Sequence, residues 1–108
     1  MRVLVAGATG YMGAAVLREL VARRVDVVAL ARPGRLLPEA LRKAVTVVEA
    51  DVVEDGDWSA HLPSFDAVIS CLASRSGAPD DAQKVDYEAN RRLLACAERH
   101  HIRHFVLL

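Results

Sequence analysis

The chain has 108 residues, of which 53% are hydrophobic and 26% are charged, so it can form one small core and lacks the composition of a disordered protein. Fourteen Lys and Arg residues balance fourteen Asp and Glu residues, which excludes a strong net attraction to nucleic acid or anionic lipid. We therefore expect a single domain over residues 1–108, with no nucleic-acid partner and no transmembrane segment.

The first half of the chain alternates between short strand-like runs and stretches with helical spacing. It opens with a predicted strand over Arg2 to Ala6, followed by a predicted helix over Tyr11 to Arg24. A second strand over Val25 to Leu30 precedes a weak helix near Leu37 to Lys43. The third strand, Val45 to Ala50, is apolar almost throughout, which predicts a strand covered on both faces.

The second half continues the alternation with a short helix near Asp57 to Leu62 and a strand over Asp66 to Leu72. A helix from Asp80 to about His100 then leads into a fifth strand, His104 to Leu108. Strands joined by helical crossovers are parallel, which predicts an α/β fold, a Rossmann-type doubly wound sheet with strand order 3-2-1-4-5. The uncovered fifth strand leads us to expect the N-terminal part of a longer protein, truncated after this strand and without its substrate region.

The cysteines and histidines of the chain do not have the spacing of a catalytic or metal-binding motif. Cys71 and Cys96 form no CxxC pair, and we interpret both as buried reduced thiols. His100, His101 and His104 straddle a helix end and a strand start, with no cysteine or carboxylate at a spacing that completes a metal site. We therefore assign no catalytic residue and no metal ligand.

A GxxGxxG run directly after the first strand is the strongest functional motif. Gly7 permits the tight turn out of the strand, Gly10 lets the backbone approach a pyrophosphate, and Gly13 lets the helix pack on the sheet. The helix N-terminus then offers N–H groups and a partial positive charge to phosphates, whereas the alternative is a purely structural turn. The predicted cofactor-binding residues of this run are Gly7, Thr9, Gly10, Tyr11, Met12 and Gly13.

The residue type at the end of the second strand indicates whether such a domain binds NADP or NAD. An acidic residue there would accept hydrogen bonds from the ribose hydroxyls of NAD, but this chain carries Arg32, with Arg35 close behind. Asp26 lies at the opposite end of the strand. A guanidinium is suited to a 2′-phosphate, so we predict NADPH as the cofactor, the alternative being two solvated loop arginines.

Residues that end the third and fourth strands complete the predicted cofactor edge. Asp51, followed by Val52, could accept a hydrogen bond from the adenine amino group or could cap the next turn. Cys71, Leu72 and Ala73 end the fourth strand, where backbone would pass beneath the cofactor. We do not expect Cys71 to be reactive, because nothing nearby in sequence would lower its pKa.

Several of these segments together resemble one enzyme superfamily. Gly7 to Gly13, Asp51-Val52, Val85 to Asn90 and His104 to Leu108 are similar to the extended and atypical branch of the short-chain dehydrogenases/reductases. That resemblance implies an NAD(P)-binding Rossmann domain. It also implies that the superfamily's Tyr-x-x-x-Lys pair, where present, follows the fifth strand and so lies outside this chain.

A narrower resemblance rests on Ser70 to Gly77 (SCLASRSG) and Lys84 to Ala89 (KVDYEA). These segments resemble the divinyl chlorophyllide 8-vinyl reductases, whose plant members usually carry Trp where Gln83 stands. The resemblance implies an NADPH-dependent enzyme of (bacterio)chlorophyll biosynthesis that reduces the 8-vinyl group of a small tetrapyrrole to ethyl. The chain has no Ser- and Arg-rich transit segment before its first strand, so we expect a bacterial cytoplasmic protein.

Two other functions remain open from the sequence. One is a non-catalytic NADP-binding redox-sensing regulator, because a fold does not determine a function. The other is an extended-branch nucleotide-sugar epimerase or dehydratase, which Arg32 disfavours because many such enzymes hold NAD with an acidic residue at that position. The oligomeric state is not predicted.

Overall fold

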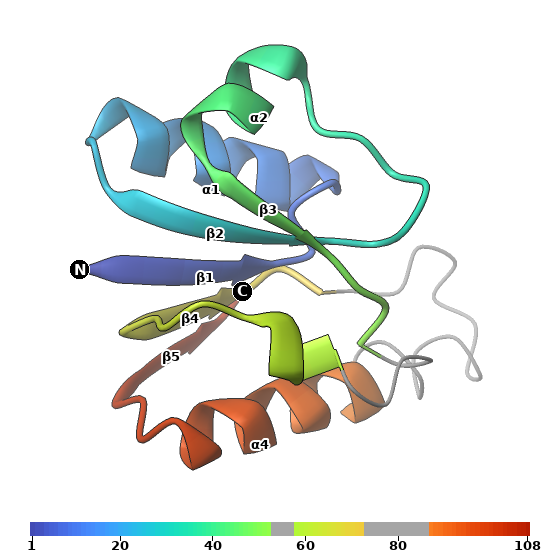
Figure 1. Cartoon of the computed structure of the whole chain (residues 1–108), viewed down its shortest axis with the longest axis vertical. Helices are drawn as coiled ribbons and strands as arrows, with labels where there is room; N and C mark the ends of the chain where they lie inside the picture. The colour runs from blue at the N-terminus through green and yellow to red at the C-terminus, as the bar shows by residue number, and fades with distance from the viewer. Residues whose placement is uncertain (53–57, 73–86) are drawn as a thin grey trace.

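The computed structural model describes residues 1–52, 58–72 and 87–108 (Figure 1). Within these residues, a five-stranded parallel sheet has the order β3-β2-β1-β4-β5, which confirms the predicted α/β fold and strand order. The strands lie close to their predicted bounds: β1 (Arg2–Ala6), β2 (Asp26–Ala31), β3 (Thr46–Glu49), β4 (Ala67–Ser70) and β5 (His104–Leu107).

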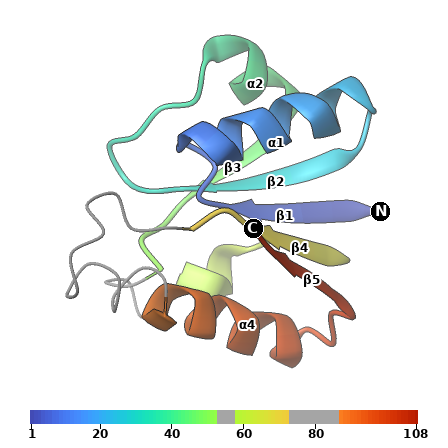
Figure 2. The same cartoon turned by 180° about the vertical axis from the view of Figure 1, so that it is seen from behind.

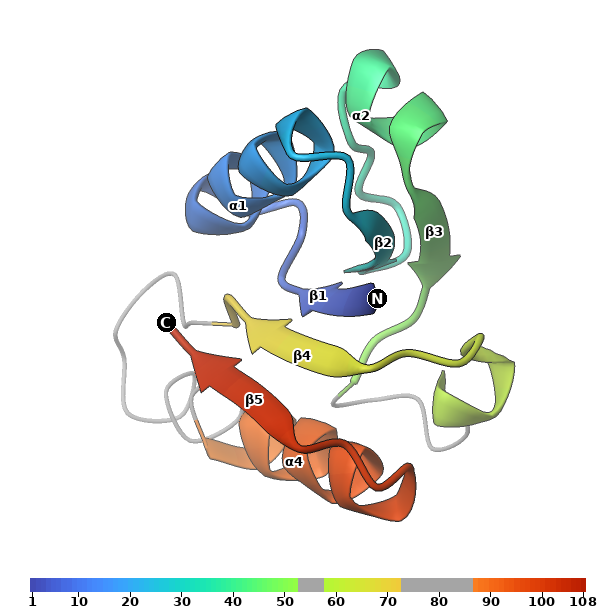
Figure 3. The same cartoon turned by 90° about the vertical axis from the view of Figure 1, so that its left-hand side faces the viewer.

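Helices cover both faces of this sheet (Figure 3). Helix α1 (Tyr11–Ala22) packs against β1 and β2, with the short α2 (Glu39–Ala44) beside it (Figure 2). Helix α4 (Asn90–Arg99) lies on the other face, together with a 3-10 helix over Trp58–His61. The helices in the described part of the chain are too short or too polar to cross a bilayer.

Alternation along β1 divides the core into two clusters. Val3 and Val5 pack on the α1 face with Leu17, whereas Leu4 packs on the α4 face with Leu93. All of these side chains are buried, because β1 is the central strand and has a partner on each side. The central strand therefore anchors the loop that follows its carboxyl end.

The prediction that the third strand is covered on both faces is wrong. Thr46, Val47 and Glu49 of β3 are exposed, and only Val48 is half-buried. The physical reason is the position of β3 at the edge of the sheet, where the six-residue α2 covers little of it. The opposite edge behaves as expected: Val106 and Leu107 of β5 are about half exposed.

Helix α4 lies within the predicted helix from Asp80 to about His100, the start of which is outside the described residues. Ala89, Leu93 and Cys96, at spacings of four and three residues, are buried on one face. Residues 87–89 form a π-helical turn directly before α4 begins. Asn90, the first residue of α4, is also buried, and its partners belong to the candidate site.

Candidate functional site

The turn between β1 and α1 is built on glycine backbone geometry. Gly7 has φ +73°, and its carbonyl oxygen accepts a hydrogen bond from the N–H of Gly10 at 3.2 Å. The N-cap of α1 is Gly10, so no side chain caps the N–H groups of the first helical turn. A helix N-terminus with this construction is suited to binding an anion.

Two of the three motif glycines are required by packing alone. A Cβ on Gly7 would lie 2.6 Å from the carbonyl oxygen of Cys71, and one on Gly13 would overlap with the carbonyl oxygen of Gly7. A Cβ on Gly10 would lie 3.5 Å from the same Gly7 oxygen, which is ordinary contact. The protein itself therefore tolerates a side chain at position 10, and the predicted reason for glycine there is close approach of a ligand.

The other motif residues surround this turn. Thr9 is half-buried, whereas Tyr11 and Met12 at the start of α1 are 92% and 54% exposed. Such exposure leaves both side chains accessible beside the predicted phosphate position. A nicotinamide dinucleotide fits this part of the chain, because the turn brings backbone close and leaves room that a Cβ would fill.

Arg32 and Asp51 meet at the carboxyl edge of the sheet. Arg32 follows β2 and Asp51 follows β3, and Arg32 Nε lies 4.0 Å from Asp51 Oδ2. The Arg32 side chain is 59% exposed, so its guanidinium remains accessible to a ligand. Asp26 lies at the opposite end of β2, as the sequence predicts, and its carboxylate pairs there with Arg2 at 3.0 Å.

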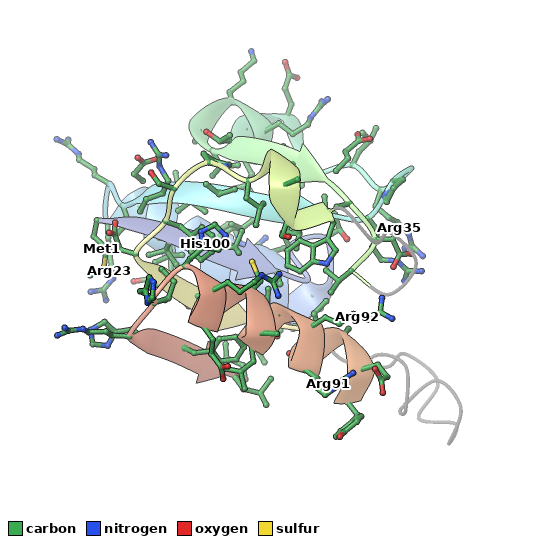
Figure 4. The ribbon with its side chains drawn as sticks, turned by 60° about the horizontal axis from the view of Figure 1, so that its bottom comes forward. Met1, Arg23, Arg35, Arg91, Arg92 and His100 are labelled. Atoms are coloured by element: carbon green, nitrogen blue, oxygen red, sulfur yellow. The ribbon has the colours of Figure 1, made fainter. Side chains whose placement is uncertain are left out.

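Two further arginines lie at this end of the molecule. Arg35 is exposed on the loop after β2, and Figure 4 shows it at the same end as Arg92 of α4. Arg92 Nη1 donates a hydrogen bond to the carbonyl oxygen of Val52 at 3.1 Å. Val52 is buried, so Arg92 links α4 to the segment after β3.

The end of β4 is held by two buried polar side chains that the sequence does not single out. The Ser70 hydroxyl donates to Asn90 Oδ1, and the Leu72 N–H donates to Ser70 Oγ at 3.4 Å. Asn90 Nδ2 donates to the Leu72 carbonyl oxygen at 3.5 Å. The two side chains thereby hold both polar groups of Leu72.

Cys71 is half-buried rather than buried as predicted, because it lies just beyond the strand end, whereas Cys96 is buried in α4. Both are free thiols. Burial raises the pKa of the Cys71 thiol, which disfavours the thiolate and agrees with an unreactive cysteine. Ala73, the last predicted residue of this edge, lies outside the described residues.

The structure thus brings the glycine turn, the ends of β2 and β3 and the end of β4 to one edge of the sheet. A doubly wound parallel sheet with a glycine turn into its first helix defines the class of Rossmann-type dinucleotide-binding domains. The chain belongs to the NAD(P)H-binding family, whose model matches residues 7–108.

Curated relatives agree with the narrower resemblance. Divinyl chlorophyllide a 8-vinyl-reductase, chloroplastic, from Oryza sativa subsp. indica is 43% identical over 98% of this chain, and that from Arabidopsis thaliana is 36% identical over 100%. The chain spans 29% of the length of each of these relatives. The photosystem II assembly factor Ycf39 of Synechocystis is 29% identical over 98% of this chain and 32% of its own length.

Solved structures support the same family. A Bacillus halodurans protein assigned as an NAD-dependent epimerase/dehydratase is 29% identical with a TM-score of 0.80, covering 99% of this chain and 50% of that one. An Agrobacterium tumefaciens short-chain dehydrogenase/reductase superfamily protein with bound NAD is 30% identical with a TM-score of 0.77, covering 99% and 32%. The cofactor class is therefore a nicotinamide dinucleotide, and the chain is similar to oxidoreductases.

Proposed function

We propose that the chain is the NADPH-binding part of an oxidoreductase that reduces the 8-vinyl group of a divinyl (proto)chlorophyllide. The observation that carries the cofactor choice is Arg32, an exposed guanidinium at the end of β2, where an NAD-selective domain carries a carboxylate. Similarity to the divinyl chlorophyllide a 8-vinyl-reductases over the whole of this chain supports the substrate class.

In this proposal, each group on the sheet edge has a separate task. The glycine turn and the first turn of α1, residues 7–13, bind the pyrophosphate through backbone N–H groups and the helix dipole. Arg32 binds the 2′-phosphate, with Arg35 as a second contact, while Asp51 and Val52 flank the adenine. Cys71, Leu72 and Ala73 line the other half of the cofactor.

The reaction adds two hydrogens across the vinyl group. When bound, NADPH supplies a hydride for one vinyl carbon, while the neighbouring carbon takes a proton, which yields the ethyl group and NADP⁺. The part of this chain is to bind and orient the dinucleotide. We assign the proton donor to no residue of this chain.

A second candidate is a non-catalytic NADP-binding protein that acts through a partner. The relative named photosystem II assembly factor Ycf39 favours it, because that name describes assembly rather than a reaction. The bacterial cytoplasm stays a prediction for either function, since the divinyl reductase relatives are named as chloroplastic.

Cofactor choice is tested by titrating the 108-residue chain with NADPH and NADH in a calorimeter. Arg32→Ala should weaken NADPH binding about 10–100-fold, because a charge-assisted hydrogen bond to phosphate is lost, and should leave NADH binding within about twofold. Arg18→Ala, an exposed arginine on α1, is the matched control and should change neither affinity. If Arg32→Ala weakened the binding of NADPH and NADH equally, Arg32 would not bind the 2′-phosphate.

The reaction itself is tested with the native protein purified from its source. NADPH oxidation that depends on a divinyl tetrapyrrole, with the ethyl product identified by mass, supports the reductase. NADPH binding without turnover on that substrate favours the non-catalytic candidate instead.

A further inference from the structure

The buried polar side chains in the described part of the core are Ser70 and Asn90, with 0% and 9% exposure. They come from different elements, Ser70 from the end of β4 and Asn90 from the start of α4. Hydrogen bonds join them to each other and to both polar groups of Leu72. The contact between β4 and α4 therefore fixes the position of the Leu72 backbone, which follows the strand.

That peptide position adjoins the glycine turn. The backbone of Cys71 and Leu72 packs closely against Gly7: a Cβ on Gly7 would lie 2.6 Å from the Cys71 carbonyl oxygen and 3.0 Å from Leu72 N. Cys71 N–H also donates to the carbonyl oxygen of Ala6 at 2.9 Å. Asn90 thus holds a backbone segment packed against the first residue of the dinucleotide motif.

Stability alone does not account for this polar pair. When both partners of a buried hydrogen bond are replaced by apolar groups of similar shape, the change is often close to neutral. The hydrogen bonds instead specify where the Leu72 peptide lies. A π-helical turn at residues 87–89 sets the entry into α4 directly before Asn90, and turns of this kind are frequent at functional sites.

Topology assigns this peptide to one half of the cofactor. In a doubly wound sheet, one mononucleotide half binds over β1, β2 and β3, and the other binds beyond the switch point between β1 and β4. Arg32 marks the adenosine half at the end of β2, so the end of β4 belongs to the nicotinamide half.

We propose that Asn90, acting with Ser70, is a positioning residue for the nicotinamide half of the cofactor. It holds the Leu72 peptide at the end of β4, so that the backbone beneath the nicotinamide nucleotide is fixed before binding. The inference rests on the proposed binding of NADPH and adds a role for residues that do not touch the adenosine half.

The test compares two ligands on the 108-residue chain: NADPH, and adenosine 2′,5′-bisphosphate, which lacks the nicotinamide nucleotide. The variant is the double substitution Ser70→Ala with Asn90→Leu, which removes both polar side chains together, so that neither is left facing an apolar partner and the Leu72 peptide loses both of its side-chain hydrogen bonds. Arg91→Ala, an exposed neighbour on α4, is the control. Circular dichroism confirms folding, and Ser70→Ala alone is used if the double variant does not fold.

We expect the variant to bind NADPH about tenfold more weakly and adenosine 2′,5′-bisphosphate within about twofold of the wild type. Equal weakening for both ligands, or no change for either, would overturn the positioning role. A wild-type chain that binds neither ligand would be a different result, because it would overturn the proposed NADPH binding and this inference with it.

Discussion

Two side-chain pairs on either side of the candidate site differ in character. Arg32 and Asp51 form a charged pair on the β2–β3 side, with side chains 59% and 26% exposed. Ser70 and Asn90 form a neutral pair on the β4–α4 side, and both are buried. A partly exposed charged pair can exchange a partner for a ligand phosphate at little cost, whereas a buried neutral pair holds its geometry because breaking it leaves polar groups without partners.

The sheet explains why each pair lies where it does. The β3 edge is thinly covered, so charged groups after β2 and β3 remain hydrated. On the other side, α4 packs over β4, and polar groups there must find partners within the protein. The comparison teaches that one side is suited to selecting a ligand and the other to fixing backbone.

The largest effect is expected at Gly7, where the two sides meet. Gly7→Ala combines a left-handed φ of +73° with a Cβ 2.6 Å from the Cys71 carbonyl oxygen. We expect a loss of about 3–5 kcal/mol in the free energy of unfolding, measured by urea denaturation.

Gly34→Ala is the matched control for this substitution. Gly34 has a similar φ of +82°, but a Cβ there meets no atom within 4 Å. Only the backbone strain remains, so the expected loss is about 1–2 kcal/mol. Equal losses for the two variants would show that contact with the backbone of Cys71 does not constrain Gly7.

An intermediate effect is expected for the buried pair in a double-mutant cycle. Ser70→Ala alone leaves Asn90 Oδ1 without the hydroxyl donor and should cost about 1–3 kcal/mol. Ser70→Ala with Asn90→Leu should cost less than the sum of the two single variants, with a coupling of about 1–2 kcal/mol. Urea denaturation of all four proteins measures the coupling, and additive losses would contradict it.

Local sequence patterns were enough to predict the strand order and the position of the glycine turn. Strand runs, helical spacing and crossover rules led to the observed strand order, and the glycine motif lies at the predicted turn. The exposure of β3 was missed because apolar composition was interpreted as cover on both faces, although the predicted order already placed that strand at an edge.

The hydrogen bonds between side chains and segments that are distant in sequence could not be predicted from these patterns. Ser70 and Asn90 are 20 positions apart, and Arg92 is 40 positions from Val52. A serine at a strand end and an asparagine near a helix start are usually interpreted as local caps. Only the packing of α4 over β4 shows that these polar groups meet each other instead.

The smallest effect is expected for the charged pair on the other side. The coupling between Arg32→Ala and Asp51→Ala in urea denaturation should be below about 1 kcal/mol and should fall further in 1 M salt, because solvent and ions screen an exposed pair. A coupling as large as that of Ser70 and Asn90 would remove the distinction between the two sides. A small one fits an arginine that Asp51 orients only weakly, and such an arginine can turn to a phosphate without a large loss of folded stability.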